Sequence, residues 1–91
     1  MASYELLIVP SAKREIEAID PLAERIRIHR KIESLMANPR QHGVEKLAGA
    51  EHHYRIRQGD YRIIYRIEDY RLIVVVIRVG HRREVYRKWV K

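Results

Sequence analysis

The chain has 91 residues, 34% of them charged, with 19 Lys and Arg against 12 Asp and Glu and no cysteine. This length predicts one domain spanning residues 1–91, and the lack of a thiol excludes disulfides, thiolate metal sites and cysteine nucleophiles. The apolar runs are far shorter than a membrane span and the N-terminus lacks a signal-peptide pattern. We therefore expect a soluble, cytoplasmic protein without a membrane partner.

The net charge of +7 is concentrated in the second half of the chain. Residues 1–50 carry eight basic and seven acidic side chains, whereas residues 51–91 carry eleven and five. This asymmetry predicts that the C-terminal half faces an anionic partner. Nucleic acid is the leading candidate, and an acidic protein is the alternative.

The first part of the chain predicts a strand followed by a helical hairpin. The apolar run within residues 4–9, which Pro10 bounds, indicates a central strand buried on both faces. Ser11 is placed to cap a helix that ends at Asp20, where a proline starts a second helix that ends before Pro39. One face of the two helices carries the apolar residues Ala12, Ile16, Ile19, Leu22, Ile26, Ile28, Ile32, Leu35 and Met36.

The middle of the chain predicts a loop and then a basic hairpin. Residues 38–52 lack a clear period and contain proline and glycine, which is typical of a loop. Residues 54–58 and 61–67 alternate between arginine and apolar or tyrosine side chains, so they read as two strands. Gly59 and Asp60 between them fit a tight turn.

The last part of the chain predicts one more strand and a tail. A turn at residues 68–70 leads into the apolar run 72–79, which is typical of a central strand covered on both faces. Residues 84–90 fit either a brief helix or an extended tail. The whole order indicates an α+β domain, in which a small, mostly antiparallel sheet carries the helical hairpin on one face.

The hairpin brings like charges together. With a two-residue turn, Arg57 faces Arg62 across the ladder, and Arg55 lies one step further along the same face. Like charges directly opposite each other cost stability, so the pair suggests a site for an anion. A solvated sheet face is the more common explanation of the alternation when it is considered alone.

Several kinds of site are excluded by spacing. None of the histidines stands with a second ligand at a spacing that closes a metal site, and adjacent His52 and His53 would point to opposite sides of a strand. The five histidines are His29, His42, His52, His53 and His81. No serine stands in a glycine-flanked elbow, and no glycine-rich phosphate loop is present. We therefore predict no metal and no cofactor.

The basic and tyrosine residues of the second half suit an RNA phosphodiester. Attack by the 2′-hydroxyl on the adjacent phosphorus adds negative charge to the phosphoryl oxygens, which forked guanidinium donors stabilise. Because arginine stays protonated, a histidine or tyrosine has to transfer the protons. The candidate residues are Arg55, Arg57, Arg62, His81, Arg82, Arg83 and Tyr86.

An ordered set of short motifs resembles the RelE branch of the RelE/ParE toxin superfamily over nearly the whole chain. The motifs are Lys46-Leu47-x-Gly49, Tyr54-Arg55-Ile56-Arg57, Tyr61-Arg62-Ile63-Ile64-Tyr65, Val79-Gly80-His81-Arg82 and Glu84-Val85-Tyr86. Members of this superfamily are toxins of type II toxin–antitoxin pairs, and the RelE branch cleaves mRNA in the ribosomal A site without a metal.

The resemblance implies a reaction and a set of partners. It implies 2′-hydroxyl attack that yields a cyclic phosphate, with the ribosome and mRNA as partners and a tightly bound antitoxin as inhibitor. We expect the antitoxin to be an acidic, RelB-like and partly disordered chain that folds on binding.

The resemblance also implies roles for single residues. It makes Arg62 the phosphate-binding arginine, Arg82 the arginine after the Val-Gly turn, and Tyr86 the C-terminal tyrosine. Arg55 and Arg57 replace lysines of the family's best-known member.

The replacement of lysine by arginine affects the proton transfer. Arginine cannot release a proton, so we expect Arg55 and Arg57 to stabilise charge. We assign the proton transfer to His81 as a hypothesis, with Tyr86 as the next candidate. Lys46 and Arg83 complete the expected RNA-binding set.

Two alternatives stay open. The ParE branch shares the fold but inhibits DNA gyrase without nuclease chemistry. A non-enzymatic RNA-binding or ribosome-associated module would use the same charge for salt-dependent phosphate affinity alone.

Overall fold

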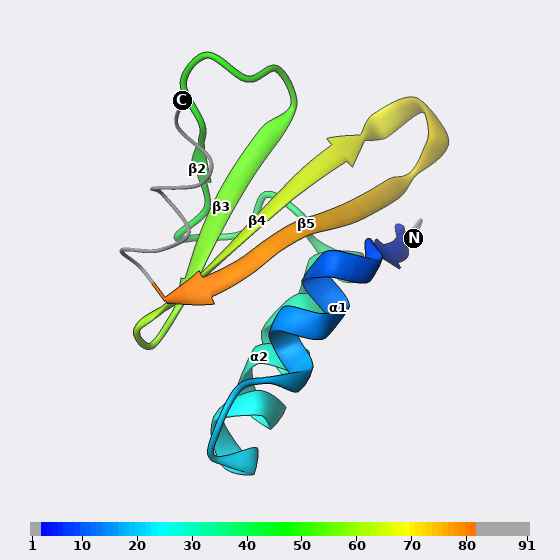
Figure 1. The fold of residues 1–91 in the computed structure, drawn as a ribbon. Helices are drawn as coiled ribbons and strands as arrows, with labels where there is room; N and C mark the ends of the chain where they lie inside the picture. Colours follow the sequence, from blue (N-terminus) through cyan, green and yellow to red (C-terminus); the bar gives the residue numbers. More distant parts are fainter. Residues whose placement is uncertain (1–2, 82–91) are drawn as a thin grey trace.

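Two helices pack on one face of a five-stranded sheet in the computed structural model, which describes residues 3–81 (Figure 1). The elements are β1 (Glu5–Ile8), α1 (Pro10–Glu17), α2 (Leu22–Ala37), β2 (Glu45–Lys46), β3 (His53–Gln58), β4 (Tyr61–Glu68), the short 3₁₀ helix η1 (Asp69–Arg71) and β5 (Ile73–His81). The strand order is β1-β5-β4-β3-β2; β1 pairs with β5 in parallel, and the other pairs described are antiparallel. The predicted α+β class, with a mostly antiparallel sheet and the helices on one face, is confirmed.

The core lies between the helices and the sheet. Alternate residues of β4 point to opposite faces, so Ile63, Tyr65 and Ile67 face the helices and are fully buried. The helices and other strands contribute a further set of buried side chains, namely Ala12, Ile16, Ile19, Ile28, Ile32, Leu35, Ile56, Val74, Val76 and Val79. No helix within residues 3–81 has both the length and the apolar character that a membrane span requires.

The basic hairpin has the predicted register. Arg57 pairs with Arg62 and Gln58 with Tyr61, which leaves Gly59 and Asp60 as the turn. Gly59 has a φ of +61°. This left-handed conformation favours glycine and explains why it stands at the first turn position.

The N-terminal strand was wrongly predicted to be central. β1 lies at the edge of the sheet beside β5, and the Leu7 side chain is 54% exposed. A run of four apolar residues has no alternation, so the pattern cannot distinguish an edge strand from a central one. The apolar β5 lies between β1 and β4 and is the central strand that its sequence predicts.

The helix ends also differ from the prediction. α1 begins at Pro10 with Val9 as N-cap, because proline suits the first helical position, and Ser11 forms no cap hydrogen bond. α1 ends at Glu17 instead of Asp20, and Pro21 takes the N-cap position of α2.

The predicted apolar stripe of α2 includes residues that do not pack against the sheet. Leu22 is 59% exposed and Ile26 is 40% exposed, because the first turns of α2 extend past the sheet (Figure 1). Within the predicted loop 38–52, β2 forms two residue pairs with β3. The predicted tail at residues 84–90 lies outside the described residues.

Candidate functional site

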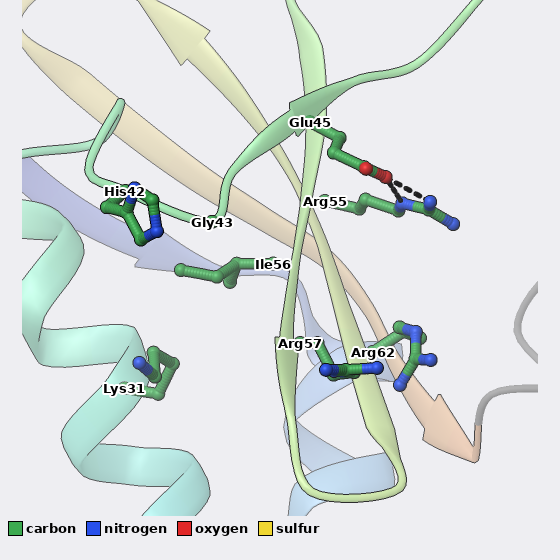
Figure 2. A pocket seen from close by; sticks show the side chains of 8 residues that line it. All are labelled: Lys31, His42, Gly43, Glu45, Arg55, Ile56, Arg57 and Arg62. Atoms are coloured by element: carbon green, nitrogen blue, oxygen red, sulfur yellow. Dashed lines mark hydrogen bonds and ion pairs between the residues drawn. The ribbon is translucent and has the colours of Figure 1, made fainter.

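A basic hollow of about 460 Å³ lies along the edge of β3 (Figure 2). It is lined by Lys31, His42, Gly43, Glu45, Arg55, Ile56, Arg57 and Arg62. β2 pairs with Tyr54 and Arg55 but not with the residues that follow them in β3. The hollow therefore forms where the sheet edge is not covered by β2.

Arg57 and Arg62 form the centre of this site. They are direct partners across the β3–β4 ladder and project on the same face of the sheet. The Arg57 side chain is exposed, and among residues 3–81 no carboxylate forms an ion pair with it. Arg62 is half-buried, and its Nη1 donates to the Tyr61 carbonyl at 3.2 Å. Two adjacent guanidinium groups create a positive potential that suits a phosphate.

The part of the basic face that lies away from the turn is partly neutralised. The Arg55 guanidinium donates from Nε and Nη2 to the Glu45 carboxylate, which lies opposite it on β2 (Figure 2). Arg66 likewise pairs with Glu68 at 2.9 Å. The pairs place compensating acids at Arg55 and Arg66, so Arg57 carries the exposed charge near the turn.

Two other predicted residues lie away from this centre. Lys46 pairs with Tyr54 and lines a separate hollow formed by residues 46–51. His81 pairs with Tyr61, and the two rings meet edge to face with centroids 6.0 Å apart.

The register of β5 determines the face on which His81 lies. The residue opposite Arg62 is Gly80, so the pleat places His81 on the other face of the sheet. Its role in proton transfer stays a prediction. Arg82, Arg83 and Tyr86 lie outside the described residues.

Comparison with known proteins identifies the family. Residues 6–86 match a protein-family model. This family is described as the ParE toxin of the type II toxin–antitoxin system parDE. The chain belongs to this toxin family. It is 30% identical over 88 residues to toxin RelG of Mycobacterium tuberculosis (strain ATCC 25618 / H37Rv), an alignment that covers 93% of this chain and 98% of RelG.

Solved structures of RelE toxins share the fold. The toxin–antitoxin complex RelBE2 from M. tuberculosis matches with a TM-score of 0.77 at 26% identity, covering 89% of this chain and 100% of that one. The isolated E. coli RelE toxin matches with a TM-score of 0.75 at 29% identity, covering 97% and 96%. These matches confirm the RelE/ParE assignment and make the protein a type II toxin of the RelE family.

A polar cluster anchors the loop that forms one wall of the toxin's hollow. Arg40 donates from its two terminal nitrogens to the two Asp69 carboxylate oxygens, each at 2.8 Å, and the Tyr4 hydroxyl donates to the same carboxylate at 2.8 Å. These hydrogen bonds, that from Arg40 first, lower the pKa of Asp69 to about 2. The Arg40 guanidinium also lies 5.3 Å from the centroid of the Tyr54 ring.

A buried hydrogen bond holds the start of the same loop. The Tyr65 hydroxyl donates to the Pro39 carbonyl at 2.6 Å, and burial raises the pKa of Tyr65. His42 and Gly43, which line the hollow, follow this anchored stretch by a few residues. The loop is therefore fixed to the sheet through Tyr65 and, through Arg40, to Asp69.

The far end of β5 is held by α1. The Glu15 carboxylate accepts a hydrogen bond from the Val79 N–H at 2.8 Å and pairs with Arg78 at 3.0 Å. β1 pairs with β5 as far as Val76, so Glu15 binds the edge that β1 leaves uncovered. The segment that Glu15 holds directly precedes Gly80, which pairs with Arg62 of β4.

Sequence reasoning missed Lys31, His42, Glu45 and Glu15. Lys31 and His42 reach the hollow through long-range packing, for which no local pattern exists. Glu45 precedes Lys46 in a two-residue strand that is too short to show a period. Within residues 3–81, no group of three or more His, Asp or Glu side chains converges in the way that a metal site requires.

Proposed function

We propose that this toxin is a metal-independent endoribonuclease that cleaves mRNA in the ribosomal A site and thereby inhibits translation. The observation that carries the proposal is the pairing of Arg57 with Arg62 at the edge of a basic hollow. Two forked cations on one face can bind a phosphate and stabilise the charge that develops on it. Like charges directly opposite each other on a sheet cost stability, and no carboxylate of residues 3–81 forms an ion pair with Arg57.

The reaction divides the roles between the residues. The 2′-hydroxyl attacks the adjacent phosphorus, the bond to the 5′-oxygen of the next nucleotide breaks, and a cyclic phosphate and a 5′-hydroxyl result. Arg62 and Arg82 bind the phosphate, with Arg57 stabilising the added charge. One group takes the proton from the 2′-hydroxyl and another gives a proton to the leaving oxygen; His81 and Tyr86 are the proposed residues. Since His81 ends β5 on the other face of the sheet, this role requires its ring to turn toward the phosphate.

The remaining basic residues bind the RNA away from the reacting atoms. We assign this role to Arg55, Arg83 and Lys46. Since Arg55 already pairs with Glu45, its replacement should weaken binding less than that of Arg57. The toxin acts where ribosomes are, in the cytoplasm.

An antitoxin is the proposed inhibitor. Two structures that this chain resembles are complexes: RelBE2 of M. tuberculosis and the archaeal RelE–RelB complex of Pyrococcus horikoshii OT3, the latter with a TM-score of 0.76 at 25% identity. An acidic RelB-like chain would complement the net charge of +7.

Expression of the toxin without an antitoxin tests the proposal. Translation arrest with mRNA cut at codon positions is the expected result. DNA damage without mRNA cleavage would instead support gyrase inhibition, and normal growth would support a plain RNA-binding module. The double variant Arg57→Gln/Arg62→Gln should relieve the arrest, whereas Lys13→Gln/Arg14→Gln, which removes two exposed charges from α1, should not.

A further inference from the structure

A second group of cations lies on α2 beside the arginine hollow. Arg30 and Lys31 stand three and four residues after Arg27, so both neighbour it on one face of the helix. They line a second hollow of about 320 Å³, together with Ser34, Gln41 and Gln58. Lys31 lines both hollows, which makes the two basic surfaces adjoin each other.

The charges of this second group are mostly uncompensated. Among residues 3–81, no carboxylate forms an ion pair with Arg30 or Lys31. Arg27 pairs with Glu24 at 3.5 Å, and its side chain is still 57% exposed. Like charges at these helical spacings cost stability, as the Arg57–Arg62 pair does in the sheet.

The uncovered edge of β3 separates the two groups of cations. In Figure 2, Lys31 and His42 lie on one side of β3, and Arg57 and Arg62 lie on the other. Arg57 lines the first hollow and its neighbour Gln58 lines the second. A strand of RNA that crosses this edge would thus pass from one group of cations to the next.

The lining of the second hollow favours a sugar–phosphate backbone. All six of its residues are polar or charged. Guanidinium, ammonium, hydroxyl and amide groups are the donors that proteins direct at phosphates and sugars. A protein segment would be expected to find an apolar or aromatic anchor, and the residues of this hollow provide none.

We propose that the RNA strand whose phosphate lies at Arg57 and Arg62 continues across the edge of β3, and that Lys31, Arg30 and Arg27 bind its neighbouring phosphates. The inference rests on the proposed function, which places RNA at the arginine pair. These contacts bind the backbone without reading bases, so they add affinity without adding sequence preference.

The test compares two double variants that lose the same charge. Arg30→Gln/Lys31→Gln removes two of the proposed phosphate-binding cations of α2, and Lys13→Gln/Arg14→Gln removes two exposed cations of α1. The probe is a short single-stranded RNA with 2′-O-methyl groups throughout, which the toxin cannot cut. Each lost phosphate contact should reduce the magnitude of the slope of log affinity against log salt by about 0.7. The slope should therefore fall by about 1.4 in Arg30→Gln/Lys31→Gln and stay nearly unchanged in Lys13→Gln/Arg14→Gln.

Cleavage on programmed ribosomes supplies a second readout. The Arg30/Lys31 variant should raise KM and leave kcat unchanged, because it loses binding that ground state and transition state share. Circular dichroism melts should show that both double variants are folded.

Two results would overturn the proposed RNA path. One is an equal change of slope in both double variants. The other is an unchanged slope in the Arg30/Lys31 variant, including the case in which this variant loses affinity only for ribosomes or only for an antitoxin. Because the modified RNA cannot be cut, an unchanged slope would overturn the proposed RNA path even in a toxin that cleaves mRNA. The absence of cleavage by the wild-type toxin would instead overturn the proposed function.

Discussion

Arg57 and Arg62 face each other across the β3–β4 ladder, with no carboxylate of residues 3–81 paired to Arg57. Repulsion between these two cations lowers the stability of the fold, and the same two cations bind the phosphate in the proposed reaction. Arg57→Thr should therefore raise the free energy of unfolding by roughly 0.2–1 kcal/mol. The same change should slow mRNA cleavage about 10²-fold, because a donor to the developing charge is lost. Urea denaturation and single-turnover cleavage measure the two effects.

Arg55→Thr is the matched control for this trade-off. It removes an arginine from the same strand and face, but that arginine is paired with Glu45. We expect no gain in stability and a smaller loss of cleavage. A destabilised Arg57→Thr variant would contradict the view that repulsion between Arg57 and Arg62 outweighs their packing.

The contact between Glu15 and Val79 should contribute more to stability than its half-exposed position suggests. Glu15→Ala leaves the Val79 N–H without its acceptor and Arg78 without its acid. The expected loss is about 1–3 kcal/mol in urea denaturation. Glu17→Ala, an exposed position on the same helix, should change stability by less than about 0.5 kcal/mol. Equal losses in the two variants would show that helix propensity, not the contact, is responsible.

The Asp69 carboxylate makes stability depend on pH in the acid range. Its pKa is about 2 in the folded toxin and about 3.9 in an unfolded chain, so the unfolded state binds more protons between these values. The contribution is complete above about pH 4 and is lost as the pH falls toward 2. Asp69→Asn should lack this part of the pH dependence.

Arg40→Gln provides the second arm of that experiment. It removes the first cause of the lowered pKa, the pair of hydrogen bonds from Arg40. Urea denaturation between pH 2 and 5 should therefore give the steepest pH dependence for the wild type and the shallowest for Asp69→Asn. Arg40→Gln should lie between them, because the hydrogen bond from Tyr4 remains. A wild-type slope that survives in Asp69→Asn would assign the acid sensitivity to another group.

Much of the fold and the centre of the site could be predicted from the sequence. Alternation with a period of two and a two-residue turn determine the register, so the pairing of Arg57 with Arg62 followed directly. The partner of Arg55 could not be predicted, because β2 consists of two residues, Glu45 and Lys46, and shows no period. The approach of Lys31 to β3 depends on how α2 packs, which local patterns do not encode.

The buried hydroxyl of Tyr65 should stabilise the loop before His42. Tyr65→Phe leaves the Pro39 carbonyl without its donor at a fully buried position, so we expect a loss of about 1 kcal/mol or more. Tyr54→Phe removes a hydroxyl that accepts from Arg40 at an exposed site, where water can replace it. Thermal melts that show the larger effect for Tyr54→Phe would contradict this ranking.

His81 is the sharpest test of the proposed chemistry, because its ring packs against Tyr61 while Gly80 faces Arg62. If His81 transfers a proton, His81→Ala should slow cleavage much more than it weakens ribosome binding. His81→Phe separates this role from packing, since it keeps a ring beside Tyr61 but has no titratable nitrogen. Cleavage at the normal rate by His81→Phe would move the proton transfer to Tyr86. Slow cleavage by both variants, with ribosome binding intact and one limb of the pH–rate profile lost, would place His81 in the reaction.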